Sequence, residues 1–91
     1  MTGETYRALK GYRKQLELAD RADYVRMTRT DILAMNPLFK DAIGRELTRS
    51  QAGCSHCVVK ALKDTYRAFL TYAKTKWGKQ IDAEDEQDDN A

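Results

Sequence analysis

Between Cys54 and Trp77 the apolar residues recur every three or four positions, over a stretch that contains neither Gly nor Pro. This spacing predicts a long amphipathic helix, because the side chains of a strand would alternate between two faces. The remaining sequence shows no sustained alternation of β-branched residues, and the whole chain contains one Pro. We therefore predict an all-α fold, a small three- to four-helix bundle. The apolar face of the long helix comprises Val58, Ala61, Leu62, Tyr66, Phe69, Tyr72, Ala73 and Trp77.

Start and stop signals divide the rest of the chain. A first helix is expected from about Glu4 to Asp20, with a bend or break near residues 19–23, where aspartates interrupt its apolar side. Asn36-Pro37 predicts the start of another helix, because Asn caps exposed amides and Pro at the first position sacrifices no hydrogen bond. Gly78 is expected to end the last helix in the left-handed conformation. These limits predict one helical domain over residues 1–78.

Charge is sorted from one end of the chain to the other. Residues 1–79 carry all 16 Lys and Arg and eight acidic residues, a net charge of +8, whereas residues 80–91 carry six acidic residues and no basic one. A run of like charges with few apolar side chains repels itself and buries little surface. We therefore predict a disordered acidic tail over residues 79–91. A basic body favours an anionic partner, and the tethered tail would compete for the same sites.

Two basic stripes with the same spacing lie opposite the apolar faces of the first and last predicted helices. If these helices lie side by side, both stripes face one direction and could neutralise the phosphates of a nucleic acid. The alternative is a solvated helix surface, which most charged helices present. No zinc-finger, RRM or KH signature is present, so base-specific contacts are not expected. The candidate nucleic-acid-binding residues are Arg7, Lys10, Lys14, Arg21, Lys60, Lys63, Arg67 and Lys74.

The sequence Cys54-Ser55-His56-Cys57 is the one motif with reactive side chains. It resembles the Cys-Gly-His-Cys active site of thioredoxin-like disulfide isomerases, and that resemblance gives Cys54 the attacking role and Cys57 the resolving role. Metal binding is a second hypothesis, although two Cys and one His supply fewer than the four ligands of a structural zinc site. The interpretation we favour is that both cysteines pack as small apolar residues and that His56 is exposed. No cofactor and no metal site is predicted.

Other function classes receive less support. The single His has no acidic partner nearby in sequence, and no phosphate-binding loop or nucleophile elbow is present, so we do not expect an enzyme or a small-molecule substrate. A helix-turn-helix can be drawn through residues 31–48, but its first helix would be barely one turn long. No apolar run spans a membrane and no secretory signal is seen, which predicts a cytoplasmic protein without membrane contact.

Two main hypotheses therefore follow from the sequence. The first is a non-catalytic binding module whose basic helical face contacts nucleic acid or another polyanion, with the acidic tail as a competitor. The second is a structural or adaptor subunit of a larger protein assembly, such as a viral particle, multi-subunit complex or homo-oligomer, in which surplus aromatic residues contact a protein partner. A dithiol redox or metal-binding protein is a third hypothesis.

Overall fold

The computed structural model describes residues 1–89, which form seven α-helices and no strand. The predicted all-α class is confirmed. The predicted number of three or four helices is wrong, because short helices with caps of their own occupy segments that were expected to be connectors or tail. The helices are α1 (Gly3–Lys10), α2 (Arg13–Ala22), α3 (Arg29–Ala34), α4 (Asn36–Ile43), α5 (Arg49–Ala52), α6 (Ser55–Ala73) and α7 (Lys76–Asp89).

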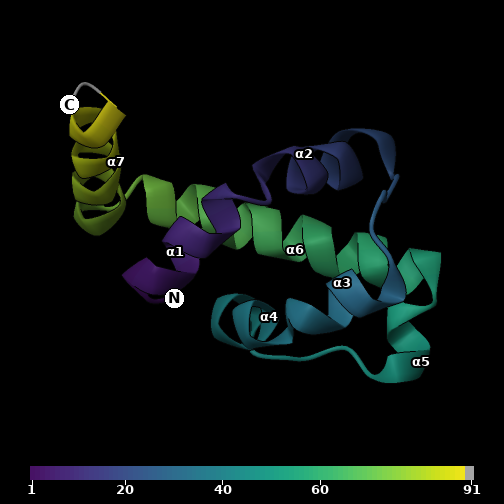
Figure 1. Cartoon of the computed structure of the whole chain (residues 1–91). Coiled ribbons are helices and arrows are strands. Elements are labelled where there is room, and N and C mark those ends of the chain that lie inside the picture. Colours follow the sequence, from purple (N-terminus) through teal and green to yellow (C-terminus); the bar gives the residue numbers. More distant parts are fainter. Residues whose placement is uncertain (90–91) are drawn as a thin grey trace.

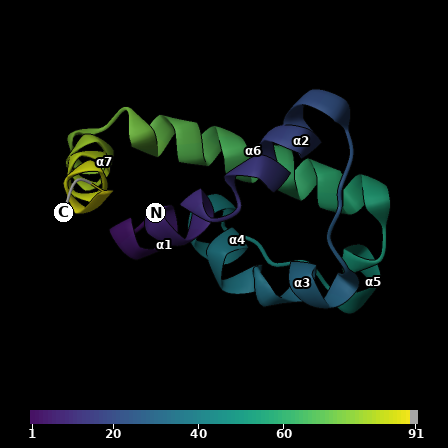
Figure 2. The ribbon, with the colours of Figure 1, turned by 45° about the horizontal axis from the view of Figure 1, so that its top comes forward.

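The long helix α6 is the centre of the molecule, and the other helices pack around it (Figure 1). Helix α2 lies along one side of α6 in the most extensive helix–helix packing of the structure, and α3 and α4 lie along the other side (Figure 1). Helix α7 crosses the end of α6 next to α1, as the turned view also shows (Figure 2). Within residues 1–89, no helix combines the length and the apolar character needed to cross a membrane.

The core contains the apolar side chains that α6 shares with its neighbours. From α6 the predicted face contributes Val58, Leu62 and Phe69, all buried. Trp77, which the sequence also assigns to this face, is 59% exposed, because α6 ends at Ala73 and the chain turns before Trp77. The other large core side chains are Tyr6, Leu9, Leu16, Ile32, Met35 and Phe39.

The first predicted helix is divided at Gly11, a break that was not predicted, whereas the break expected near residues 19–23 is present at the end of α2. The amides of Gly11 and Tyr12 donate to the carbonyls of Ala8 and Leu9, three residues back rather than four, and α2 then starts at Arg13. Helix α2 ends at Ala22, and its C-cap residue Asp23 adopts the left-handed conformation with φ 52°. The division gives the side chains of α1 and α2 different neighbours.

Asn36 begins α4, as predicted, but its side chain does not cap that helix. Its amide nitrogen donates to the carbonyl of Leu47 at 2.9 Å, and its Oδ1 accepts from the Leu47 amide at 2.8 Å. These two hydrogen bonds hold the segment that follows α4 against the start of that helix. Thr48 and Gln51 then form a capping box that turns the expected connector into the single-turn helix α5.

The end of α6 differs from the prediction because Thr75, not Gly78, separates the last two helices. The Thr75 hydroxyl donates to the Tyr72 carbonyl at 2.6 Å and accepts from the Gly78 amide at 3.1 Å. Gly78 lies inside α7, where an added Cβ would come within 2.2 Å of the Tyr72 carbonyl oxygen. A glycine is therefore needed for the close approach of α7 to α6, not for a left-handed cap.

The prediction of disorder from residue 79 is wrong for residues 79–85, which belong to α7. Ile81 packs against the core, and its Cδ1 lies 3.0 Å from the position that a Cβ on Gly3 would occupy. Asp82, Glu84 and Asp85 are opposed by cations of α1, which offsets the repulsion among these three carboxylates. Of the predicted tail, residues 90–91 lie outside the described part of the chain.

Candidate functional site

The acidic helix α7 contacts two of the predicted binding residues on α1. Arg7 Nη2 lies 2.6 Å from Glu84 Oε2. Lys10 Nζ lies 2.8 Å from Asp82 Oδ1 and 2.6 Å from Asp85 Oδ2. The paired residues are 72 to 77 positions apart in sequence, so the contacts are tertiary. Two of the predicted cationic sites therefore already hold carboxylates of the same chain.

Asp82 is the carboxylate most firmly held in this contact. Besides its ion pair with Lys10, it accepts hydrogen bonds from the Tyr6 hydroxyl at 3.0 and 3.1 Å. Burial by itself would raise the pKa of Asp82, but the hydrogen bonds from Lys10 and Tyr6 outweigh it and hold that pKa below the ordinary value. Burial, reinforced by the hydrogen bond to Asp82, raises the pKa of Tyr6.

The ring of Tyr6 connects this contact to the core. It is 2% exposed and lies between two aromatic residues of α6, with ring centroids 4.9 Å from Phe69 and 4.9 Å from Tyr72. Lys10 Nζ lies 5.6 Å from the Tyr6 ring centroid, within range of a cation–π contact. The hydroxyl thus has a fixed position from which it holds Asp82 in the middle of α7.

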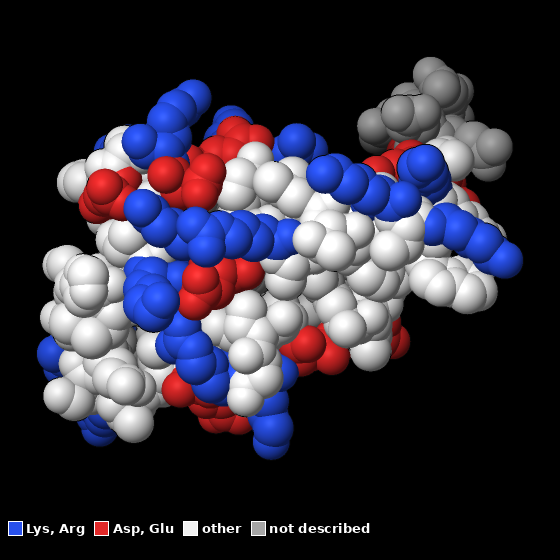
Figure 3. All heavy atoms as spheres, turned by 180° about the vertical axis from the view of Figure 1, so that it is seen from behind, with Lys and Arg blue, Asp and Glu red and all other residues white. Residues whose placement is uncertain are grey.

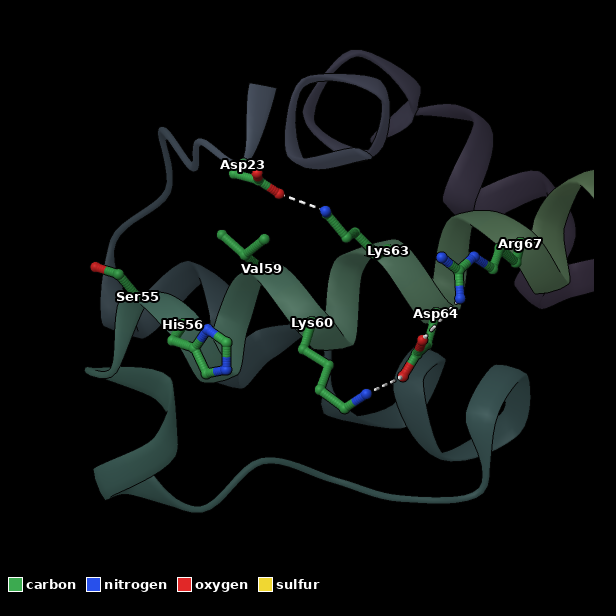
Figure 4. A pocket seen from close by; sticks show the side chains of 8 residues that line it. All are labelled: Asp23, Ser55, His56, Val59, Lys60, Lys63, Asp64 and Arg67. Atoms are coloured by element: carbon green, nitrogen blue, oxygen red, sulfur yellow. Dashed lines mark ion pairs between the residues drawn. The ribbon is translucent and has the colours of Figure 1, made fainter. Parts of the chain in front are cut away.

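A second group of predicted residues lines a hollow of about 500 Å³ along α6 (Figure 4). Lys63 forms an ion pair with Asp23, the C-cap residue of α2, and this pair connects the two helices at one edge of the hollow (Figure 4). His56 and Val59 line the hollow nearer the start of α6 (Figure 4). The hollow is open and mixed in charge.

Asp64 is shared by three cations beside the same hollow. Its carboxylate lies 3.1 Å from Arg45, 3.8 Å from Arg67 and 4.0 Å from Lys60. One negative charge among three positive charges leaves a local excess of two, which a bound anion could neutralise. Neither Arg45 nor Asp64 was among the residues that the sequence assigned to a binding site.

The remaining predicted residues are Lys14, Arg21 and Lys74. Lys14 and Arg21 line a hollow of about 590 Å³ on α2 together with Arg26. Lys74 follows α6 as its C-terminal cap. Within residues 1–85, no carboxylate lies within 4.0 Å of the charged groups of these three residues. They are the predicted cations best placed to meet an external anion.

The structure does not gather the eight predicted residues on one face. Arg7 and Lys10 face α7, the α2 pair lies on a separate hollow, and the α6 residues lie beside Asp23 and Asp64. Seen from behind, Lys and Arg side chains alternate with Asp and Glu over the surface (Figure 3). The predicted alignment of two stripes fails because α1 and α2 are separate helices with different neighbours.

The Cys54–Cys57 segment forms the start of α6. Cys54 is the N-cap residue, and its sulfur accepts from the Cys57 amide at 3.3 Å. Both thiols are free and half-buried, and neither belongs to the hydrophobic core; His56 is exposed, as expected. Helix α5, not a strand, precedes the motif. Across the described residues, no three His, Cys, Asp or Glu side chains come together as metal ligands would.

No protein-family model, curated protein or solved structure matches this chain. The contacts described above are therefore the observations that bear on its function. Of these, the occupation of α1 cations by α7 carboxylates gives the most direct indication of what the basic surface can bind. Carboxylates and phosphates are both anions that accept hydrogen bonds from Arg and Lys.

Proposed function

We propose that this protein is a non-catalytic binding module for nucleic acid or another polyanion, in which α7 is an internal competitor. The observation that carries the proposal is the placement of Glu84 and Asp85 on Arg7 and Lys10. An external polyanion would replace these carboxylates with its own anionic groups. Specific base contacts are not part of the proposal.

A polyanion can replace the α7 carboxylates because the ion pairs at the exposed edge of α7 are weak. The side chains of Arg7 and Glu84 are each about half exposed, at 52% and 49%. Ion pairs of that kind contribute little stability, typically below about 1 kcal/mol, and salt screens them further. A polyanion that reaches several cations at once also releases condensed counterions, which a single carboxylate does not. The outer acids of α7 therefore compete with a polyanion without blocking it.

Cations without a carboxylate partner in residues 1–85 extend the surface beyond α1. Lys14, Arg21 and Arg26 surround the α2 hollow, where Glu17 is the acidic residue and is itself paired with Arg13 at 2.9 Å. The excess positive charge beside Asp64 offers a further contact. An anionic chain that passes over two of these regions would gain from both, whereas a small anion would reach only one.

The test is a binding titration with duplex and single-stranded DNA at about 50 mM and about 200 mM salt, conditions between which phosphate contacts weaken steeply. The test variant is Glu84→Gln/Asp85→Asn, which removes the outer carboxylates of α7 but keeps Asp82. The matched control is Glu4→Gln/Glu46→Gln, which changes the net charge equally at two exposed acids of the main body.

We expect the α7 variant to bind DNA at least about threefold more tightly than the control at the lower salt, with a steeper salt dependence. Circular dichroism of each variant reports whether the fold is retained. Equal affinities of the two variants would refute the role of α7. Absence of binding by all three proteins at the lower salt would refute polyanion binding itself.

A second candidate function, that of an adaptor in a protein assembly, is favoured by the exposed aromatic and aliphatic side chains near the end of α6. Trp77 is 59% exposed, with the Lys76 ammonium 5.0 Å from its ring centroid, and Leu70 is 36% exposed. Exposed Trp is enriched where proteins bind one another. Sedimentation of the wild-type protein against Trp77→Ala tests self-association through this residue; equal, concentration-independent sedimentation would exclude it.

A further inference from the structure

We infer that Cys54 and Cys57 form a thiol–disulfide exchange site that reacts with low-molecular-weight disulfides and closes into an intrachain disulfide. The inference rests on the start of α6 and does not depend on polyanion binding. It starts from the position of the two residues, one helical turn apart at the start of a 19-residue helix. Both side chains are reachable from solvent, which a buried structural pair would not be.

The hydrogen bonds of the pair assign different roles to its members. The Cys57 amide donates to the Cys54 sulfur at 3.3 Å. An N-cap sulfur further benefits from the partial positive charge of the helix N-terminus, which stabilises a thiolate. The neighbouring Cys57 thiol and the Cys57 amide lower the pKa of Cys54, and the neighbouring Cys54 side chain raises the pKa of Cys57. Cys54 is thus the nucleophile and Cys57 the resolving thiol.

A cation and a hollow lie against the residues that flank the nucleophile in sequence. The guanidinium of Arg29 packs on Gly53, where an added Cβ would come within 2.2 Å of Arg29 Nη2. Arg29 lines a hollow of about 290 Å³ together with Gly53 and Ser55, the two sequence neighbours of Cys54. A small disulfide that carries a carboxylate, such as oxidised glutathione, could place its carboxylate on Arg29 while its sulfurs approach Cys54.

The reaction balances without any other oxidant. The Cys54 thiolate attacks one sulfur of the small disulfide, the S–S bond breaks, and the first small thiolate leaves with the bonding electrons and takes up a proton. Cys57 then loses its proton and attacks the Cys54 sulfur of the mixed disulfide, which expels the second small thiolate. Two protein thiols are oxidised to one disulfide, and one small disulfide is reduced to two thiols.

The experiment treats the reduced full-length protein with oxidised glutathione, stops the reaction with acid at intervals and measures intact mass. The wild-type protein is expected to lose the mass of two hydrogen atoms. Cys57→Ser is expected to gain one glutathionyl group and to keep it, because the resolving thiol is gone. Cys54→Ser, in which serine can still cap α6, is expected to react at least about threefold more slowly than Cys57→Ser.

Two reference measurements separate a folded-state site from two ordinary thiols. The rate of each single-cysteine variant is also measured in denaturant, where the helix start is absent. Faster reaction of Cys57→Ser when folded than when denatured supports the site. Equal rates for the two single variants when folded, or a wild-type protein that accumulates two glutathionyl groups instead of closing the disulfide, would overturn the inference.

Discussion

The hydroxyl of Tyr6 donates a hydrogen bond to the carboxylate of Asp82, 76 residues further along the chain, at 3.0 Å. The Tyr6 ring is buried against Phe69, whereas Asp82 belongs to a segment whose composition predicts disorder. One hydrogen bond therefore connects the aromatic core to the acidic helix α7. It determines how firmly α7 is held beside the basic residues of α1.

Replacing Tyr6 by Phe should loosen α7 while leaving the aromatic packing in place. The change removes the hydrogen bonds to Asp82, and a bond to a charged group contributes about 1.5–3 kcal/mol. We expect urea unfolding to show that the free energy of unfolding falls by an amount near the lower end of that range, because Lys10 still pairs with Asp82. Hydrogen exchange at residues 79–85 should accelerate more than elsewhere. Tyr12→Phe, which lacks such a partner, is the control, and equal effects of the two changes would contradict the assignment.

Stability should fall at low pH partly through Asp82. The pKa of Asp82 is lowered in the folded protein, so its contribution is present above the ordinary aspartate pKa, about 3.9, and disappears as the pH falls through the folded value. The stability difference between wild type and Asp82→Asn should therefore be largest near neutral pH and vanish in acid. A difference that is constant from neutral pH to pH values well below about 3.9 would rule out this linkage.

The raised pKa of Tyr6 predicts that the protein also loses stability at alkaline pH. Its contribution is present below the ordinary tyrosine pKa, about 10, and is lost as the pH rises through the folded value. Wild type should thus lose stability above about pH 10 more steeply than Tyr6→Phe. Denaturant unfolding at a series of alkaline pH values measures this, and parallel curves for the two proteins would argue against it.

Replacing Gly78 by Ala should displace α7 from α6. The new Cβ would meet the Tyr72 carbonyl oxygen at 2.2 Å, and a backbone atom cannot rotate away as a side chain does. We expect the free energy of unfolding to fall by about 1–3 kcal/mol, the usual effect of overpacking. Hydrogen exchange in α7 should also be faster. Gly11→Ala, whose Cβ would meet the Ala8 carbonyl at 3.3 Å, should cost less. A smaller effect at residue 78 than at residue 11 would show that the two helices are not in close contact.

Asn36→Ala should destabilise the protein by about 2–3 kcal/mol, because it leaves the amide and the carbonyl of buried Leu47 without their partners. Asn36→Asp keeps an acceptor for the Leu47 amide but loses the donor to its carbonyl. We therefore expect Asn36→Asp to lower the stability less than Asn36→Ala does, as measured by thermal or urea unfolding. If Asn36→Ala and Asn36→Asp lower the stability equally, the hydrogen bond from the Leu47 amide contributes nothing measurable to it.

Local sequence signals predicted much of the fold but not its subdivision. The apolar spacing after Cys54 predicted α6 and its buried Val58, Leu62 and Phe69. The Thr75 hydroxyl is the kind of N-cap signal that could have located the turn before α7, whereas Gly78 was read as an end because glycine is common there. Whether a glycine ends a helix or allows another backbone to approach depends on what packs against it.

The all-α class, the long central helix and the sorting of charge between a basic body and an acidic end could all be predicted without coordinates. Those properties follow from spacing and composition, which act on neighbouring residues. The contact of Asp82 with Tyr6 and Lys10, and the division of the predicted basic residues among several surfaces, became visible only once the helices were packed together. Such pairings depend on which helix faces meet, and helical periodicity gives each helix a face without specifying its partner.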